Sequence, residues 1–216
     1  ALPASYLFIG WLLLAWLSWR WLASGDWRRL AEPGRANLFL GATVVALAIW
    51  QVRAGIKPGL SFHLFGITTL TLMFGYWRAW VAGVIVLAAN AAFGRGSFAA
   101  LGLDALLSVA LPAWISWQFM RLLEKKLPRH FFIYAFGSGF FGAALAIVAV
   151  GLATTLVMAM SGAYTTEYLY ENYTPYMLLM MSWAEAFSTG MAVTLMAVYR
   201  PHWLETYDER ATLNER

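Results

Sequence analysis

Seven long apolar runs, separated by short polar stretches, dominate the sequence. They cover residues Tyr6–Leu22, Asn37–Val52, Leu60–Gly75, Trp77–Phe93, Ala100–Leu123, Phe131–Ser161 and Tyr176–Tyr199. Several reach roughly the 20 residues that a helix needs to cross the hydrocarbon core of a bilayer. Because unpaired backbone groups in lipid cost several kcal/mol, each run is predicted to be helical. The pattern predicts an all-α integral membrane protein with about seven transmembrane helices, formed by residues 1–200 and followed by a short cytoplasmic tail over 201–216.

The basic residues divide unequally between the two sides that seven crossings create. One side holds Arg20, Arg28, Arg29, Arg35, Arg78, Arg121, Lys125, Lys126, Arg129, Arg200, Arg210 and Arg216, and the other holds only Arg53, Lys57 and Arg95. Cytoplasmic loops of membrane proteins carry an excess of Lys and Arg. This asymmetry predicts that the N-terminus lies outside and the C-terminus inside, as in a multi-pass protein of a bacterial cytoplasmic membrane.

Composition narrows the class of protein further. Hydrophobic residues make up 61% of the chain and charged residues only 12%, about half the charged fraction of a soluble domain. The formal net charge is +4, but the basic residues lie in short loops, so we expect lipid contacts and no nucleic acid partner. The sequence contains no Cys, which excludes disulfides, thiolate metal sites and a cysteine nucleophile.

Three ionisable side chains lie within the predicted spans, away from their cytoplasmic ends. They are His63, Asp104 and Glu185, and all three spans run from the outside inward, so one outward-opening cavity is expected to hold them. Asn90 and Thr68 are expected to support these three residues from behind, without contacting the ligand of the cavity directly. Imidazole nitrogen and carboxylate oxygen suit first-row divalent metals. The alternative is that His63 bonds a neighbouring helix and that Asp104 caps its helix or pairs with Arg95.

Other chemistries lack their sequence signatures. The predicted spans contain no pair of histidines for a bis-His haem, and the sequence contains no Walker A loop for a nucleotide. No G-x-S-x-G turn of a serine hydrolase is present either. The chain is therefore not expected to be an enzyme.

Three segments resemble motifs of one transporter family. They are "SFHLFG" (61–66), "AAFGRGSFAALGLDALLSVALPAW" (91–114) and "AEAFSTGMAVTLMAVYRP" (184–201). In this order and spacing they resemble the CbiM/NikM family, the substrate-capture permeases of cobalt and nickel energy-coupling-factor (ECF) transporters. The similarity covers about residues 58–201.

The resemblance implies a bundle of six or seven helices that captures a divalent metal from outside. It places His63 at the family's metal-ligating histidine, Glu185 at the carboxylate of the last helix, Asn90 at a supporting amide and Asp104 where the family has asparagine. It also implies a membrane coupling subunit and two cytoplasmic ATPases as partners. The family's N-terminal Met-His motif is missing, since the chain begins with "ALPASYLFIG".

Two hypotheses remain open at this stage. In the first, the chain is the metal-binding permease of an uptake system for cobalt, nickel or zinc, energised by separate ATPases. In the second, it is a non-catalytic structural or assembly subunit of a larger membrane complex that keeps the permease fold without transporting metal. The missing N-terminal histidine favours the second, and the order of the three motifs favours the first.

Overall fold

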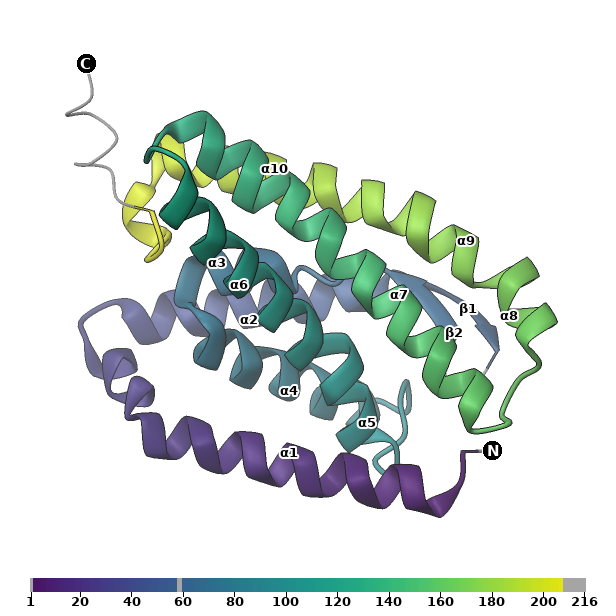
Figure 1. The fold of residues 1–216 in the computed structure, drawn as a ribbon. Helices are drawn as coiled ribbons and strands as arrows, with labels where there is room; N and C mark the ends of the chain where they lie inside the picture. The colour runs from purple at the N-terminus through teal and green to yellow at the C-terminus, as the bar shows by residue number, and fades with distance from the viewer. Residues whose placement is uncertain (1, 58–59, 208–216) are drawn as a thin grey trace.

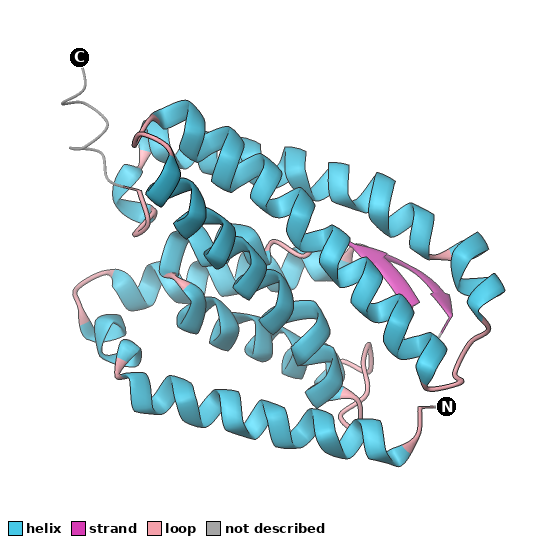
Figure 2. Cartoon of the chain, viewed as in Figure 1, coloured by secondary structure: helices cyan, strands magenta, loops and turns pink. Residues whose placement is uncertain are grey.

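The computed structural model describes residues 2–57 and 60–207. These residues are mostly helical, apart from one two-stranded hairpin (Figures 1 and 2). The elements in chain order are α1 (Ala4–Ser24), η1 (Asp26–Ala31), α2 (Arg35–Gln51), β1 (Arg53–Lys57), β2 (Leu60–His63), α3 (Ile67–Phe74), α4 (Tyr76–Ala92), α5 (Leu101–Ala105), η2 (Leu106–Ala110), α6 (Leu111–Lys126), η3 (Ile133–Phe141), α7 (Gly142–Met160), α8 (Thr166–Asn172), α9 (Thr174–Tyr176), η4 (Met177–Met181), α10 (Ser182–Tyr199) and η5 (Pro201–Trp203). The prediction of a predominantly helical chain is confirmed.

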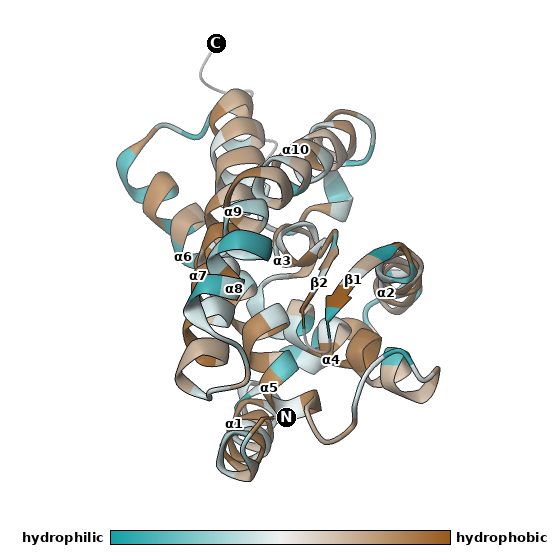
Figure 3. Cartoon of the chain, turned by 90° about the vertical axis from the view of Figure 1, so that its right-hand side faces the viewer, coloured by the Kyte–Doolittle hydropathy of each residue, from teal (hydrophilic) through white to brown (hydrophobic). Residues whose placement is uncertain are grey.

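Four continuous helices in the described residues are long and apolar enough to cross a membrane. They are Ala4–Ser24, Leu101–Lys126, Ile133–Met160 and Thr166–Tyr199, and the helix Arg35–Gln51 is apolar but shorter. Many of their large apolar side chains are exposed, and the brown colour of the helices in Figure 3 marks the hydrophobic residues along them. Such surfaces are unfavourable in water and favourable in lipid, so the chain is a multi-pass membrane protein.

The third predicted span is wrong in its first part. Residues expected to begin a helix at Leu60 instead form β2, which pairs in antiparallel fashion with β1. The helix α3 starts only at Ile67 and has eight residues, about 12 Å at 1.5 Å per residue. Non-helical backbone is tolerated in membrane proteins where it is buried by protein or lines a cavity. Here the hairpin pairs its own backbone groups, and Leu60 is completely buried.

The elements define two ends of the bundle (Figure 1). The N-terminus, the hairpin and α8 lie at one end, on the right of the figure, which we call the hairpin end. The segment η1 and the last described residues lie at the opposite end. Each of α2, α4 and α7 runs between the two, so hydrogen-bonding groups at the hairpin end are separated from those at the other by the length of a helix.

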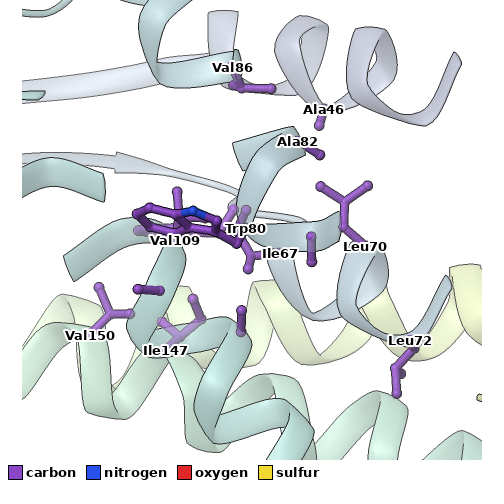
Figure 4. Close-up of a cluster of buried hydrophobic side chains, with 14 of the residues drawn as sticks. Ala46, Ile67, Leu70, Leu72, Trp80, Ala82, Val86, Val109, Ile147 and Val150 are labelled. Atoms are coloured by element: carbon purple, nitrogen blue, oxygen red, sulfur yellow. The ribbon is translucent and has the colours of Figure 1, made fainter. Parts of the chain in front are cut away.

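Tight helix packing forms the centre of the bundle. Trp80 of α4, Ile67 of α3 and Val109 of η2 are each at most 1% exposed and belong to one hydrophobic cluster (Figure 4). A Cβ added at Gly83 of α4 would lie 2.3 Å from the Cγ1 of Val109. The glycine therefore permits α4 to approach η2 closely enough to bury the Trp80 indole.

The first helix joins the bundle through a backbone contact. A Cβ added at Gly10 would lie 2.6 Å from the Leu103 nitrogen, and one at Gly102 would lie 2.5 Å from the Gly10 carbonyl carbon. Gly10 is the only residue of α1 that is buried. The Gly10–Gly102 crossing is therefore the main anchor of α1, and small residues serve this purpose in membrane helices.

Charged groups tie the chain together at the end opposite the hairpin. Arg78 of α4, whose side chain is 3% exposed, donates two hydrogen bonds of 2.6 Å to the Glu205 carboxylate and one of 2.9 Å to Asp26. Thr206 donates to the Leu72 carbonyl, and Leu204 is 2% exposed. Residues 201–207 of the predicted tail thus pack on the bundle, and residues 208–216 lie outside the described part of the chain.

Candidate functional site

The hairpin forms one wall of a cavity of about 670 Å³. Side chains alternate between the two faces of a strand. Residues Arg53, Gly55 and Lys57 of β1 and Ser61 and His63 of β2 line the cavity. On the other face, Phe62 stacks against Tyr173 with ring centroids 5.7 Å apart and planes 7° apart. The period of two therefore places His63 and Arg53, which are paired in the hairpin register, on the same face. Lys57 lies beyond a shift in that register and also lines the cavity.

Two aromatic rings hold the imidazole of His63. Its centroid lies 4.5 Å from that of Trp50 and 4.4 Å from that of Phe65, with the Phe65 ring stacked at 29°. The Trp50 Nε1 donates a 2.8 Å hydrogen bond to the Phe65 carbonyl, which fixes the two rings relative to each other. The His63 ring is thus fixed in orientation by two neighbouring ring contacts.

The proton position on His63 follows from its hydrogen bond. Its Nδ1 lies 3.1 Å from the carbonyl oxygen of Leu64, and a carbonyl can only accept. Nδ1 therefore carries the proton in this contact, which leaves the lone pair on Nε2. A neutral imidazole oriented by a carbonyl at one nitrogen and open at the other is a common arrangement for a metal ligand.

Glu185 fixes the backbone that follows His63. Its two carboxylate oxygens accept hydrogen bonds from the backbone N–H groups of Phe65, at 2.7 Å, and Gly66, at 2.6 Å. The side chain is 1% exposed. These donors lie at the N-terminus of α3, where N–H groups lack helical partners and the helix dipole favours a negative charge. Glu185 therefore holds the bend between β2 and α3, with Gly66 in the left-handed region at φ 66°.

Asp104 and Asn90 line the same cavity as His63. Asp104 lies in α5, beside the π-helical turn η2, and is partly exposed. Asn90 in α4 donates through Nδ2 to the Val86 carbonyl and accepts at Oδ1 a 3.1 Å hydrogen bond from Gln51. This bond links the ends of α2 and α4 beside the hairpin. A carboxylate and an amide therefore face the cavity together with the imidazole.

The structure brings some of the predicted site residues together and separates others. His63, Asp104 and Asn90 share the cavity, whereas Glu185 is not among its lining residues. Thr68 also lies away from it, where its hydroxyl contacts that of Ser116 at 2.7 Å and links α3 to α6. Within residues 2–57 and 60–207, no group of three or more His, Cys, Asp and Glu side chains has the arrangement of a metal site.

Sequence reasoning missed the residues that orient His63. Trp50 lies near the end of the predicted span Asn37–Val52 and Arg53 lies in a predicted loop, so neither was expected beside the imidazole. One signal was available, since the sequence "RAGIKPGLSFH" (53–63) has a Pro-Gly dipeptide between two short segments, and this dipeptide marks turns. The hydrophobicity of the second segment favoured a helix instead.

Comparison with known proteins places this fold among metal transporters. The family model CbiM, described as the cobalt uptake substrate-specific transmembrane region, matches residues 1–203. A solved structure described as a truncated transition metal transporter has a TM-score of 0.78 at 20% identity, covering 92% of this chain and 96% of that one. A second, described as a transition metal transporter, has a TM-score of 0.77 at 19% identity, covering 93% of both chains. Among curated proteins, none matches the sequence significantly.

Proposed function

The chain belongs to the CbiM family of cobalt uptake substrate-specific transmembrane regions, and we propose that it captures a divalent transition metal of the cobalt and nickel class for uptake. The observation that carries this proposal is the imidazole of His63, which contacts Trp50 and Phe65, keeps its lone pair on Nε2 and lies on the wall of a cavity that also contains Asp104. Nitrogen and carboxylate donors together select transition metals over magnesium and calcium.

We assign different roles to the predicted site residues. His63 and Asp104 are the proposed metal donors, and Asn90 supports the cavity wall through Gln51 and Val86. Glu185, which the sequence suggested as a third donor, has both oxygens engaged by backbone N–H groups and is proposed to position His63. Thr68 is proposed to keep α3 in place through Ser116.

The proposed orientation has the hairpin end outside and the opposite end in the cytoplasm of a bacterial cell. The strong excess of Lys and Arg at the end opposite the hairpin supports it. In this arrangement the hairpin and α3 together make the third of seven passes, since they return the chain from the hairpin end to the opposite one (Figure 1). The cavity then opens toward the external supply of metal.

Energy for release is proposed to come from other subunits. The sequence has no nucleotide-binding loop, and the family resemblance implies a membrane coupling subunit and two cytoplasmic ATPases. A second candidate function, a structural subunit without transport, is favoured by the lack of a three-ligand cluster among the described residues. Co-purification distinguishes them, because ATPases and a coupling subunit support transport and subunits of another membrane complex support the alternative.

Metal titration of the purified chain tests the proposal. Co²⁺, Ni²⁺ or Zn²⁺ is added in detergent, and binding is followed by intrinsic tryptophan fluorescence and by equilibrium dialysis. His63→Ala is expected to weaken binding at least about tenfold, the effect of losing one metal ligand or its support. His202→Ala, at an exposed histidine of the opposite end, is the matched control. Equally poor binding by the wild type and His63→Ala, both for the metal ions alone and for the same ions added with citrate, would contradict the proposal.

A further inference from the structure

The cavity that holds His63 is lined by more positive than negative charge. Arg53, Lys57 and Arg95 line it, and Asp104 is the one acidic residue among the described residues that do so. The two acidic residues of α8, Glu167 and Glu171, are not part of the lining. A site built for a bare dication would be expected to have the opposite balance, because like charges repel.

The nearest of these cations is paired directly with His63. In the hairpin register Arg53 is opposite His63, and opposite residues of an antiparallel pair have Cβ atoms about 4.5–5.5 Å apart on the same face. A metal ion on His63 would therefore lie beside a guanidinium group. Unless an anion accompanies the metal, this neighbour opposes binding.

The three cations are not neutralised by carboxylates of the described residues. Arg95 donates a 3.0 Å hydrogen bond to the Gln51 carbonyl, and the Lys57 Nζ lies 4.1 Å from the ring centroid of Tyr168. Ion pairs within residues 2–57 and 60–207 all involve other residues, at the end opposite the hairpin. Guanidinium and ammonium groups without carboxylate partners in a concave site suit an anionic ligand.

The volume of the cavity and the number of metal donors in it also favour an anionic ligand that is larger than a bare ion. A cavity of about 670 Å³ is within the range of about 300–1,000 Å³ typical of small-molecule sites, and it is far larger than a bare ion requires. The described donors, His63 and Asp104, are fewer than the four ligands that zinc takes in most protein sites. A chelating molecule would occupy the volume and complete the coordination.

We propose, resting on the metal-capture function above, that the physiological ligand is a divalent transition metal bound in a small anionic carboxylate chelate. The chelate's free carboxylate oxygens pair with Arg53, Lys57 and Arg95, and its metal takes His63 Nε2 at an open coordination position. The hairpin thus recognises both parts of the complex, since Arg53 and Lys57 bind its carboxylates and His63 binds its metal. No bond of the chelate needs to break for capture.

Equilibrium dialysis with two labels tests this inference. The purified full chain is dialysed against ⁶³Ni²⁺ alone, against nickel with excess ¹⁴C-citrate, and against ¹⁴C-citrate alone. The expected result is retention of both labels in equal amounts from nickel–citrate, at least tenfold tighter than retention of free nickel or of citrate alone. Arg53→Gln is expected to weaken nickel–citrate binding at least tenfold, and Arg53→Lys to restore most of it.

Controls separate this inference from the proposed function. Arg121→Gln, at an exposed position of α6, is expected to bind nickel–citrate like the wild type, and size-exclusion profiles verify that each variant is folded. Free nickel bound as tightly as nickel–citrate, with dependence on His63 but not on Arg53, overturns the chelate and leaves metal capture standing. Citrate alone bound as tightly as nickel–citrate also overturns it. Retention of neither nickel form overturns both.

Discussion

Replacing Glu185 with Gln is expected to loosen the segment that carries His63. The carboxylate accepts hydrogen bonds from Phe65 and Gly66, one on each oxygen. A glutamine amide has one oxygen and one NH₂ group. It can accept from one of the two backbone donors, and its own NH₂ group then faces the other. One N–H group at the start of α3 is left without an acceptor in a site where the side chain is 1% exposed.

The size of the effect follows from these two contacts. A hydrogen bond to a charged group contributes about 1.5–3 kcal/mol, and a buried donor without an acceptor costs about 1–3 kcal/mol. Because the substitution also removes the cost of burying a charge, we expect a net loss of about 3 kcal/mol in the free energy of unfolding. For a chain of this size, 1 kcal/mol corresponds to about 2–4 °C in Tm, so the expected decrease in Tm is about 6–12 °C.

Intrinsic tryptophan fluorescence during heating in detergent measures this change. The chain has twelve Trp, so the total emission follows unfolding of the bundle, including the segment in which Trp50 contacts His63 and Phe65. Glu171→Gln, at an exposed carboxylate of α8, is the control and is expected to change the free energy of unfolding by less than about 0.5 kcal/mol. If Glu185→Gln unfolds within about 2 °C of the wild type, Glu185 does not hold the bend.

Three further predictions test the remaining contacts. Gly10→Ala places a Cβ against the Leu103 backbone and is expected to destabilise the bundle by about 1–3 kcal/mol in thermal unfolding. The control Gly41→Ala has open space around it and is expected to be neutral or stabilising. Equal effects of the two substitutions would contradict the close Gly10–Gly102 crossing. Arg78→Met removes the bidentate partner of Glu205, which keeps only the longer contacts of Arg29 at 3.4 Å and Arg35 at 3.3 Å. It is expected to cost about 1–3 kcal/mol, with exposed Arg121→Met as the control. A decrease in Tm no larger than that of the control would show that the pair does not secure residues 201–207. Trp50→Phe keeps a ring beside His63 but removes the hydrogen bond to the Phe65 carbonyl. We expect the free energy of unfolding to fall by about 0.5–1.5 kcal/mol and nickel retention in dialysis to weaken. Unchanged nickel retention would show that His63 does not need the Trp50 hydrogen bond.

The helices could be predicted from the sequence because their causes are local. A run such as Phe131–Ser161 is apolar throughout, and helical hydrogen bonds satisfy its backbone wherever it packs, so the observed helix Ile133–Met160 follows the prediction closely. The run Leu60–Gly75 is also largely apolar, yet its first residues form a strand. Hydrophobicity reports burial, and a strand buried by neighbouring helices has the same composition as a helix in lipid.

The candidate site, like the helices, could be predicted from the sequence only in part. The cost of placing His63, Asp104 and Glu185 in apolar runs identified them as functional candidates, and the structure does bring His63 and Asp104 to one cavity. The common direction of the three predicted spans suggested that Glu185 would join them. The direction of a span does not give the direction of a side chain, and Glu185 points to the backbone of Phe65 and Gly66 instead.

The sequence by itself determined the membrane class, the positions of the long helices and the residues whose polarity requires an explanation. These depend on composition and on contacts within a few residues. Only the tertiary structure decided that Trp50 and Phe65 contact His63, that Arg53 lies opposite it in the hairpin, and that Arg78 joins Asp26 to Glu205. These partners come from different elements or from the register of a hairpin. Such pairings depend on how the whole chain packs and leave no periodic pattern in the sequence.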